Sequence, residues 1–206
     1  MAAGNDIKRA QTDIAIEQLF ADRWSPYAFD PRPVEDEKLL SVLEAARWAP
    51  SSFNEQPWSF IIARRQDTEG FDRMLGCLLE GNQGWARNAG VLMITVAQKN
   101  FSRNNKPNRV CEHDIGLAAA NLTLQAMALG LHSHQMGGID LTKCRHTYKI
   151  PQDYDPVTGI ALGYVPDQSA DVDPEMAQRD QAPRARKPLS DFVFEDAWQQ
   201  SAAVTG

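Results

Sequence analysis

Two short segments near opposite ends of the chain carry guanidinium groups at a spacing that could bind one anion. Arg23 and Ser25 are two residues apart, and Arg184 and Arg186 have the same spacing. Side chains at positions i and i+2 of an extended backbone point to the same side. Because arginine offers a charged fork of N–H donors, each pair is a candidate phosphate clamp. The ordinary alternatives are a surface ion pair beside a helix-ending serine, and a solubilising basic patch.

A polar turn at residues 49–58, with the sequence APSSFNEQPW, is the second candidate site. Pro50 ends the helical pattern before it, because proline lacks an N–H donor and clashes with the preceding turn. Ser51, Ser52 and Asn54 then place short donors and acceptors beside free backbone amides. Such a turn can line a concave site for a planar ligand rich in heteroatoms. A capping turn without a ligand is the alternative.

The cysteines and histidines favour neither a disulfide framework nor a metal centre. Cys77, Cys111 and Cys144 are odd in number and far apart, which suits reduced thiols. The dense run at 111–114, Cys-Glu-His-Asp, could suggest a nucleophile or a metal site, but neighbours on a helix point in different directions. His132 and His134 would share one side of a strand without a third ligand, so we expect packed or surface histidines.

Hydrophobic periodicity supplies the elements that must position these residues. It predicts helices over 12–20, 34–48, 70–79, 111–129 and 142–148, and strands over 59–64, 91–96, 131–136 and 157–164. The run at 59–64 is apolar enough to indicate burial on both faces. The glycines of 81–85 interrupt the third helix. The helix over 111–129 is apolar nearly all round and ends at Gly130, which indicates either a subunit interface or a central helix within the chain.

The chain divides into three parts by composition. Residues 1–11 are polar and predict a flexible N-terminus, and residues 12–165 predict one domain. Residues 166–206 are expected to form an extended arm and tail, because Pro, Asp, Gln and Ser dominate up to residue 183. The apolar run at 192–194 would need burial, which suggests that the arm reaches another subunit.

Composition and charge exclude several classes of partner. The chain has 206 residues, 43% hydrophobic and 23% charged, as is typical of one soluble globular domain. A net charge of −6 without a dense Lys/Arg block argues against nucleic acid or an anionic membrane as the main partner. No apolar run has membrane length, and residues 1–9 lack the apolar segment of a secretory signal. We therefore expect a cytoplasmic protein.

Together these segments resemble the FMN-dependent nitroreductase family. The matching stretches are Arg23-x-Ser25 with Phe29 and Pro33-Val34, residues 46–58, Gly81-Asn82-Gln83-x-Trp85, Asp114-Ile115-Gly116, residues 129–131, Gly137-Gly138, residues 160–164 and Arg184-x-Arg186-Lys187-Pro188. They occur in the family's order over roughly residues 12–194. The resemblance implies an α+β fold, with helices packed on a mostly antiparallel sheet. It also implies an intertwined homodimer in which the C-terminal arm reaches the partner.

The same resemblance implies two FMN molecules at the dimer interface and the residues that contact them. Arg23, Ser25, Arg184 and Arg186 would hold the phosphate and ribityl chain, and Pro50, Ser51, Ser52 and Asn54 from the other subunit would line the isoalloxazine. Met136, Gly137 and Gly138 would lie near the central ring, and Asn82 would lie at the pyrimidine edge. Trp24, Tyr27 and Gln56 are further expected contacts of the cofactor. A glycine amide of 137–138 would donate toward flavin N5.

The implied activity is hydride transfer from NAD(P)H through the flavin to a small aromatic acceptor such as a nitroaromatic, a quinone or a similar conjugated molecule. The chemistry belongs to the flavin, so no catalytic side chain and no metal are expected. Fold likeness leaves open a relative that dehalogenates or destroys flavin, and a flavin-binding dimer without turnover that acts as a carrier or interaction module.

Two positions depart from the family's pattern. Tyr27 stands where a lysine or arginine is common, and losing that cation should lower the flavin's reduction potential unless Arg87 or Arg109 replaces it. Gly137 stands where many relatives carry a larger polar residue, which would leave a roomier pocket.

Overall fold

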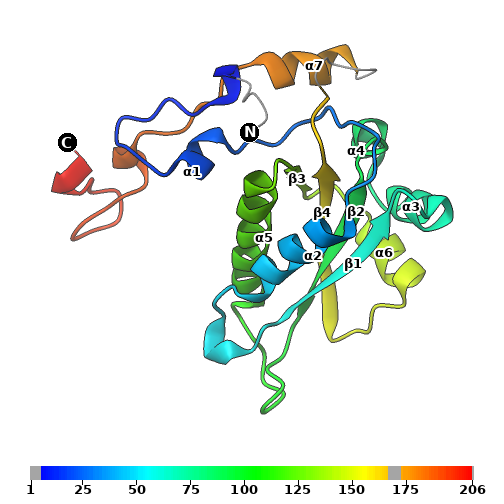
Figure 1. Ribbon diagram of the computed structural model, residues 1–206. Helices are drawn as coiled ribbons and strands as arrows, with labels where there is room; N and C mark the ends of the chain where they lie inside the picture. Colours follow the sequence, from blue (N-terminus) through cyan, green and yellow to red (C-terminus); the bar gives the residue numbers. More distant parts are fainter. Residues whose placement is uncertain (1–5, 167–172, 206) are drawn as a thin grey trace.

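A four-stranded antiparallel sheet forms the centre of the computed structural model, which describes residues 6–166 and 173–205 (Figure 1). The strands are β1 (Trp58–Arg64), β2 (Val91–Gln98), β3 (His132–Met136) and β4 (Tyr154–Gly163), in the order β1-β2-β4-β3. The inner strand β2 is buried along its first seven residues, which are apolar except for Thr95. The predicted α+β fold with an antiparallel sheet is confirmed.

Strand β1 lies at the edge of the sheet and differs from its prediction. Only Ala63 is buried in it, and Ile62 is 41% exposed. The predicted burial on both faces is therefore wrong within this chain, because an edge strand has a neighbour on one side only.

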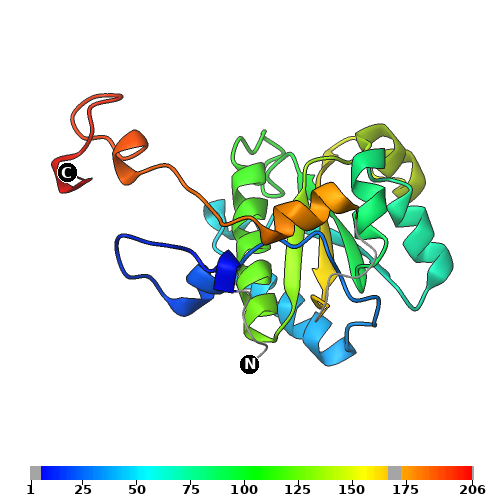
Figure 2. The ribbon, with the colours of Figure 1, turned by 90° about the horizontal axis from the view of Figure 1, so that it is seen from above.

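Helices cover both faces of the sheet (Figures 1 and 2). Alternate residues of β2 point to opposite faces, so Val91 and Met93 join the core beneath α2 (Asp36–Arg47) and α5 (Cys111–Ala128). Leu92 and Ile94 join the other core, beneath α3 (Thr68–Leu75), α4 (Glu80–Ala86) and α6 (Leu141–Tyr148). Two apolar layers thus hold the sheet rigidly between helices.

The predictions for α5 and for the 81–85 segment have different outcomes. Helix α5 ends at Ala128, and Gly130 takes a φ of 74°, as predicted for a helix end. One face of α5 is buried inside the chain, as expected for a central helix. Gly116 and Ala120 on its other face are exposed. Residues 81–85 lie inside α4 instead of breaking a helix, and α3 already ends at Leu75. Tertiary packing of Trp85 and Ala86 outweighs the low helix propensity of two glycines.

The two ends of the chain are more structured than their composition predicts. A 3-10 turn, η1 (Asp6–Lys8), packs against α7 (Pro174–Gln181), where Lys8 Nζ donates to the carbonyls of Arg179 (2.5 Å) and Ala182 (2.7 Å). Asp173 caps α7 by accepting from the Glu175 N–H at 2.9 Å. The extended conformation predicted for the arm is thus wrong at residues 174–181, which form a helix. The flexibility predicted for residues 1–11 stays a prediction, with a 3-10 turn at residues 6–8. Residues 1–5 and 167–172 lie outside the described ranges. Helix α1 (Gln18–Asp22) replaces the longer helix predicted over 12–20.

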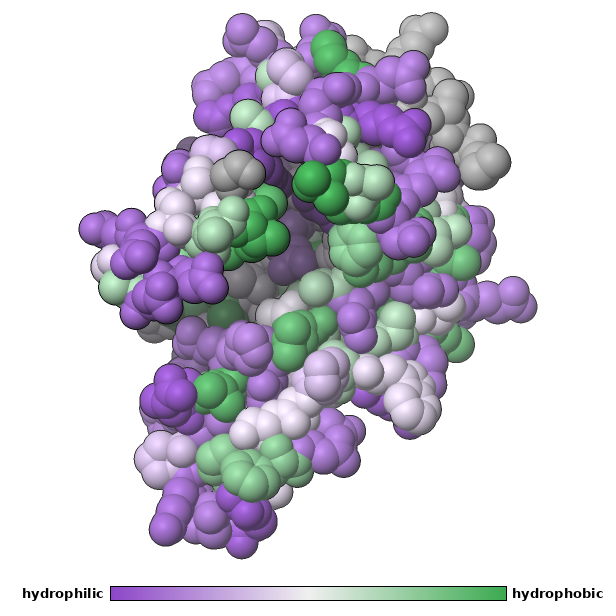
Figure 3. Space-filling model, turned by 90° about the vertical axis from the view of Figure 1, so that its left-hand side faces the viewer, coloured by the Kyte–Doolittle hydropathy of each residue, from purple (hydrophilic) through white to green (hydrophobic). Residues whose placement is uncertain are grey.

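Beyond α7 the chain leaves the body of the molecule, on the same side as the loop before α1 (Figures 1 and 2). This arm contains the short turns η3 (Leu189–Asp191) and η4 (Ala203–Thr205). Two of its aromatic side chains are open to solvent, with Phe192 57% and Trp198 83% exposed. Figure 3 looks onto this side and shows hydrophobic side chains around a hollow.

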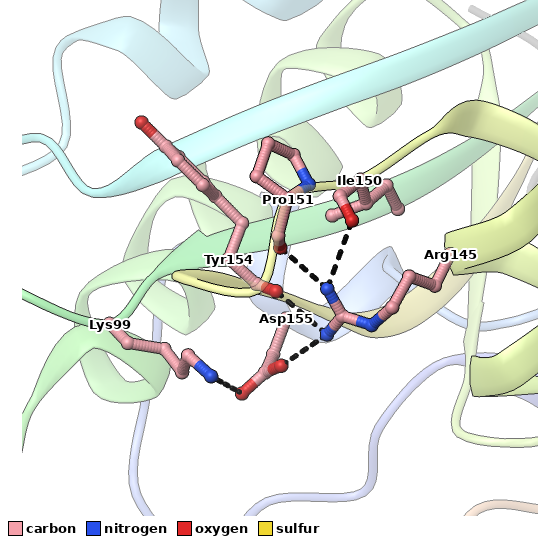
Figure 4. Close-up of polar contacts among 6 residues, drawn as sticks. All are labelled: Lys99, Arg145, Ile150, Pro151, Tyr154 and Asp155. Atoms are coloured by element: carbon pink, nitrogen blue, oxygen red, sulfur yellow. Dashed lines mark hydrogen bonds and ion pairs between the residues drawn. The ribbon is translucent and has the colours of Figure 1, made fainter.

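Arg145 ties the loop between α6 and β4 to both elements (Figure 4). Its guanidinium donates to the carbonyls of Ile150 (3.1 Å), Pro151 (2.5 Å) and Tyr154 (2.8 Å), and to Asp155 Oδ1 (2.5 Å). Because one rigid fork satisfies three backbone acceptors and a carboxylate, the start of β4 has a fixed position. In the described ranges no helix has the length and hydropathy needed to cross a bilayer.

Candidate functional site

The two predicted arginine segments meet at one end of the sheet. The Arg184 guanidinium donates to the backbone carbonyls of Ala21 and Arg23, which joins the C-terminal segment to the N-terminal one. Arg23 Nη1 lies 3.4 Å from Ser25 Oγ, so both side chains point to the same side as expected. The Nε atom of Arg184 is buried and has no hydrogen-bond partner among the described residues. Arg184 therefore anchors the backbone and still leaves one donor unused.

Arg23, Arg184 and Arg186, hereafter the arginine cluster, repel one another. Burial lowers the pKa of Arg23, and the charge of Arg186 lowers it further. Burial likewise lowers the pKa of Arg184, with smaller contributions from the charges of Arg23 and Arg186 and an opposing one from Asp22. Within the ranges 6–166 and 173–205, none of the three guanidiniums forms an ion pair. Concentrated positive charge without a carboxylate partner favours binding of an anion.

The backbone from Arg23 onward runs along one face of β3. Trp24 meets His132 edge to face at 5.7 Å between ring centres, and Tyr27 meets His134 in the same way at 4.7 Å. The Nδ1 atom of His134 lies 2.8 Å from the Pro26 carbonyl. The two histidines thus share one side of the strand, as predicted, and pack against aromatic rings. No group of three or more possible metal ligands occurs in the part of the chain that the structure describes.

Both of these histidines are held in the neutral form. Burial lowers the pKa of His132 to about 4. Burial also lowers the pKa of His134, although the Pro26 carbonyl and the charge of Asp180 oppose that effect. The face of β3 beneath Trp24 and Tyr27 therefore stays uncharged at neutral pH, and the cations next to these two rings are Lys8, 5.3 Å from the centre of the Trp24 ring, and Arg179 at Tyr27.

Strand β3 leads directly into the predicted glycine turn. Met136 is buried, and Gly137 is exposed with no atom within 4 Å of an added Cβ, so a ligand can approach its backbone. The Gly138 carbonyl accepts from Asn82 Nδ2 (3.0 Å) and from the Leu79 N–H (2.9 Å).

Asn82 uses its side chain within the chain. Its Oδ1 atom accepts from Trp85 Nε1 at 3.2 Å, while its Nδ2 atom donates to Gly138. An added Cβ on Gly138 would lie 2.4 Å from Asn82 Nδ2, so any larger residue at position 138 would force the Asn82 amide to move. The structure therefore makes Asn82 the support of the glycine turn, a role that the sequence alone did not indicate.

The polar turn at 50–56 has a strained backbone. Phe53, Asn54 and Gln56 have φ values of 54°, 56° and 53°, a region that side chains other than glycine seldom adopt. Ser51 Oγ accepts from the Gln56 N–H at 3.0 Å. The Ser52 N–H donates to the buried carboxylate of Asp114 at 3.0 Å, which ties the turn to the first turn of α5. The sequence alone gave no sign that Asp114 supports the polar turn.

One chain does not bring the polar turn to the arginine cluster. Figure 1 places η2 (Ser52–Asn54), at the start of β1, at the opposite end of the molecule from α7. Pro50, Asn54 and Gln56 are exposed, and Ser51 and Ser52 are partly exposed. The single chain thus assembles Arg23, Trp24, Ser25, Tyr27, the glycine turn and the basic C-terminal segment into one region, and it holds the polar turn apart.

Helix α7 adds two residues that sequence analysis missed. The buried carboxylate of Asp180 accepts the backbone N–H of Tyr27 (3.0 Å) and of Ala28 (2.9 Å). Arg179 Nη1 donates to Tyr27 Oη at 3.3 Å. Two features of the sequence are typical of this helix: Pro174 directly after the capping Asp173, and the i, i+4 pair Glu175 and Arg179. The polar composition of the segment favoured an extended arm instead.

The chain is thus an antiparallel α+β protein whose arginine cluster is a candidate site for an anion. The sequence model of the Nitroreductase family matches residues 20–164, and the chain belongs to that family. A solved structure described as an oxidoreductase containing FMN is similar at 36% identity and a TM-score of 0.87, covering 98% of this chain and 100% of that one. An FMN-dependent nitroreductase from Clostridium difficile R20291 is 26% identical with a TM-score of 0.63, covering 76% and 91% of the two chains.

A curated relative from Archaeoglobus fulgidus carries the provisional name NADH dehydrogenase/NAD(P)H nitroreductase. It is 29% identical over 155 residues, which is 73% of this chain and 86% of the relative.

Proposed function

We propose that this chain is an FMN-dependent oxidoreductase that takes hydride from NAD(P)H and reduces a conjugated acceptor such as a nitroaromatic or a quinone. The observation that carries the proposal is the arginine cluster, where three guanidiniums from both ends of the sequence lie together and form no ion pair with any residue that the structure describes. Family membership and the similar FMN-containing structure support a flavin oxidoreductase. When bound, FMN would supply the hydride chemistry at N5.

The residues present fit such a cofactor. A doubly charged phosphate needs fixed cationic donors, which Arg23 and Arg186 would provide together with the unpartnered Nε of Arg184. Ser25 would add a hydroxyl beside Arg23. The open backbone at Gly137 would let a flat ring approach the glycine turn, whose position Asn82 fixes.

The proposed enzyme is a homodimer, in which the polar turn of one subunit completes the site of the other. The segment that carries Pro50, Ser51, Ser52, Asn54 and Gln56 lies at the opposite end of its own chain from α7 (Figure 1), so these residues would meet the ligand of a partner. The exposed Gly116 and Ala120 on α5 would allow a close helix contact with a partner, and the exposed aromatic residues of the arm would be buried against it. Strain in the polar turn would then serve to present its amides to the partner's ligand.

Comparing FMN with riboflavin tests the phosphate site directly. The two ligands share the ring and differ in the phosphate, so Arg186→Gln should weaken FMN binding by about tenfold or more and leave riboflavin binding unchanged. Lys187→Gln is the matched control, because it removes an adjacent exposed cation outside the cluster. Equal affinity of the wild-type protein for FMN and riboflavin would contradict the phosphate assignment.

Visible spectra and NAD(P)H oxidation with a quinone then test turnover. Yellow protein that oxidises NADH or NADPH supports the proposal. Bound FMN without NAD(P)H oxidation indicates a carrier, loss of the flavin spectrum after reduction in air indicates a flavin-destroying enzyme, and protein that stays colourless with added FMN overturns the assignment.

A further inference from the structure

Helix α7 holds a cation against the hydroxyl of Tyr27. Arg179 Nη1 lies 3.3 Å from Tyr27 Oη, and its Cζ atom lies 5.7 Å from the centre of the ring. The other arm of the guanidinium donates to Glu175 Oε1 at 2.7 Å. The helix cannot easily slide, because Asp180 accepts the Tyr27 N–H and Lys8 binds the carbonyls at its C-terminal end. Arg179 is therefore fixed relative to Tyr27 from both sides.

Tyr27 occupies the space between the arginine cluster and the glycine turn. It follows Arg23 and Ser25 along β3, and its ring meets Trp85 edge to face at 5.3 Å. Trp85 Nε1 donates to Asn82, which in turn donates to the Gly138 carbonyl. An unbroken series of contacts thus leads from Arg179 through Tyr27 to the glycine turn.

Arg87, one of the two cations that the sequence suggested for this neighbourhood, lies elsewhere. It lines a cleft of about 430 Å³ together with Arg65, Thr68 and Asn88. Arg109, the other, is exposed in the loop before α5. Arg179 is the cation that the structure places at Tyr27.

We propose that Tyr27 and Arg179 act as one polarised hydrogen-bond donor toward the pyrimidine edge of bound flavin, and that Arg179 thereby raises the flavin's midpoint potential. This inference rests on the proposed function. A ligand with its phosphate at the arginine cluster and N5 at the glycine turn would place its ribityl side, which carries N1 and O2, along Tyr27. Bound FMN that had accepted a hydride would carry one negative charge at N1 and O2, and Tyr27 would donate to that charge. A hydroxyl that already binds a guanidinium donates more strongly to that charge.

Arg179 acts here as a positioning residue, so the experiment must measure a property other than turnover. The measurement is the midpoint potential of bound FMN, from photoreduction against reference dyes. Arg179→Gln should weaken the preference of the site for the reduced, charged ring about tenfold. For a two-electron couple this corresponds to a midpoint potential about 30 mV more negative. Tyr27→Phe should have a similar effect. The double variant should match either single variant, because two residues that form one donor are not additive.

The chain offers a close control for the loss of an exposed arginine. Arg73 pairs with Glu69 at i, i+4 on α3, as Arg179 pairs with Glu175 on α7, and the two arginine side chains are 49% and 52% exposed. Arg73→Gln should leave the potential unchanged, and Arg179→Lys should retain part of the wild-type value. The melting temperature and the affinity for oxidised FMN of Arg179→Gln should stay near wild type, which separates an electrostatic effect from loss of α7.

Four results would overturn the inference. These are an unchanged potential in Arg179→Gln with FMN bound, an equal change in Arg73→Gln, additive effects in the double variant, and a change that merely follows a loss of stability. Wild-type protein that takes up no FMN would overturn the proposed function as well, whereas bound FMN with an unaltered potential overturns this inference alone.

Discussion

Replacing His132 by phenylalanine should make the protein less sensitive to acid. His132 lies on β3 beneath Trp24, next to the arginine cluster, and its Nδ1 atom is buried without a hydrogen-bond partner in the described ranges. Its pKa falls from the ordinary 6.5 to about 4 because burial disfavours the charged ring. Phenylalanine keeps an aromatic ring against Trp24 and removes the group that titrates.

The sign of the effect follows from the lowered pKa of His132. Between pH 6.5 and pH 4 the unfolded chain binds a proton at this position and the folded chain does not, so stability is complete above pH 6.5 and declines as the pH falls. Proton linkage with these two pKa values gives a loss of about 2 kcal/mol at pH 5 and about 3 kcal/mol at pH 4, relative to pH 8.

The assay is urea unfolding followed by circular dichroism at pH 8 and pH 5, at one protein concentration. The free energy of unfolding of wild-type protein should drop by about 2 kcal/mol more than that of His132→Phe between the two pH values. His113→Gln controls for the loss of an exposed histidine on α5. Parallel pH dependence of the wild-type protein and His132→Phe would refute the assignment of a neutral, buried His132.

Two further substitutions test the supports of the site. Gly138→Ala should lower the free energy of unfolding by about 1–3 kcal/mol, because the new Cβ would displace Asn82 from its bond to the Gly138 carbonyl. Gly137→Ala is the control and should have the stability of the wild type, because no atom lies within 4 Å of the added Cβ. Equal losses of stability in the two variants would contradict the close contact between Gly138 and Asn82. Arg145→Met should cost about 1–3 kcal/mol in urea unfolding, since it removes the guanidinium that donates to three loop carbonyls and to Asp155 (Figure 4). Arg73→Met on the surface of α3 should change stability by less than about 0.5 kcal/mol. If Arg73→Met loses as much stability as Arg145→Met, the hydrogen bonds of Arg145 contribute nothing specific.

Local patterns predicted most of the elements. The apolar run at 91–96 became β2, and the small-residue helix at 111–129 became α5, because periodicity and burial act over a few neighbouring residues. The same reasoning failed at residues 12–17 and 174–181. The first segment has apolar residues at helical spacing but no core to pack against, with Ile14 68% exposed. The second is polar, yet contacts with Lys8 and Tyr27 stabilise a helix there.

The sequence by itself determined which side chains could bind an anion, because the spacing of Arg23 and Ser25 and of Arg184 and Arg186 is a local property of an extended backbone. Only the tertiary structure decided that these segments meet, that Arg184 binds the backbone of Arg23, and that the polar turn lies at the far end of the same chain. Contacts between residues about 160 positions apart depend on how the whole chain packs, and no short-range pattern encodes them.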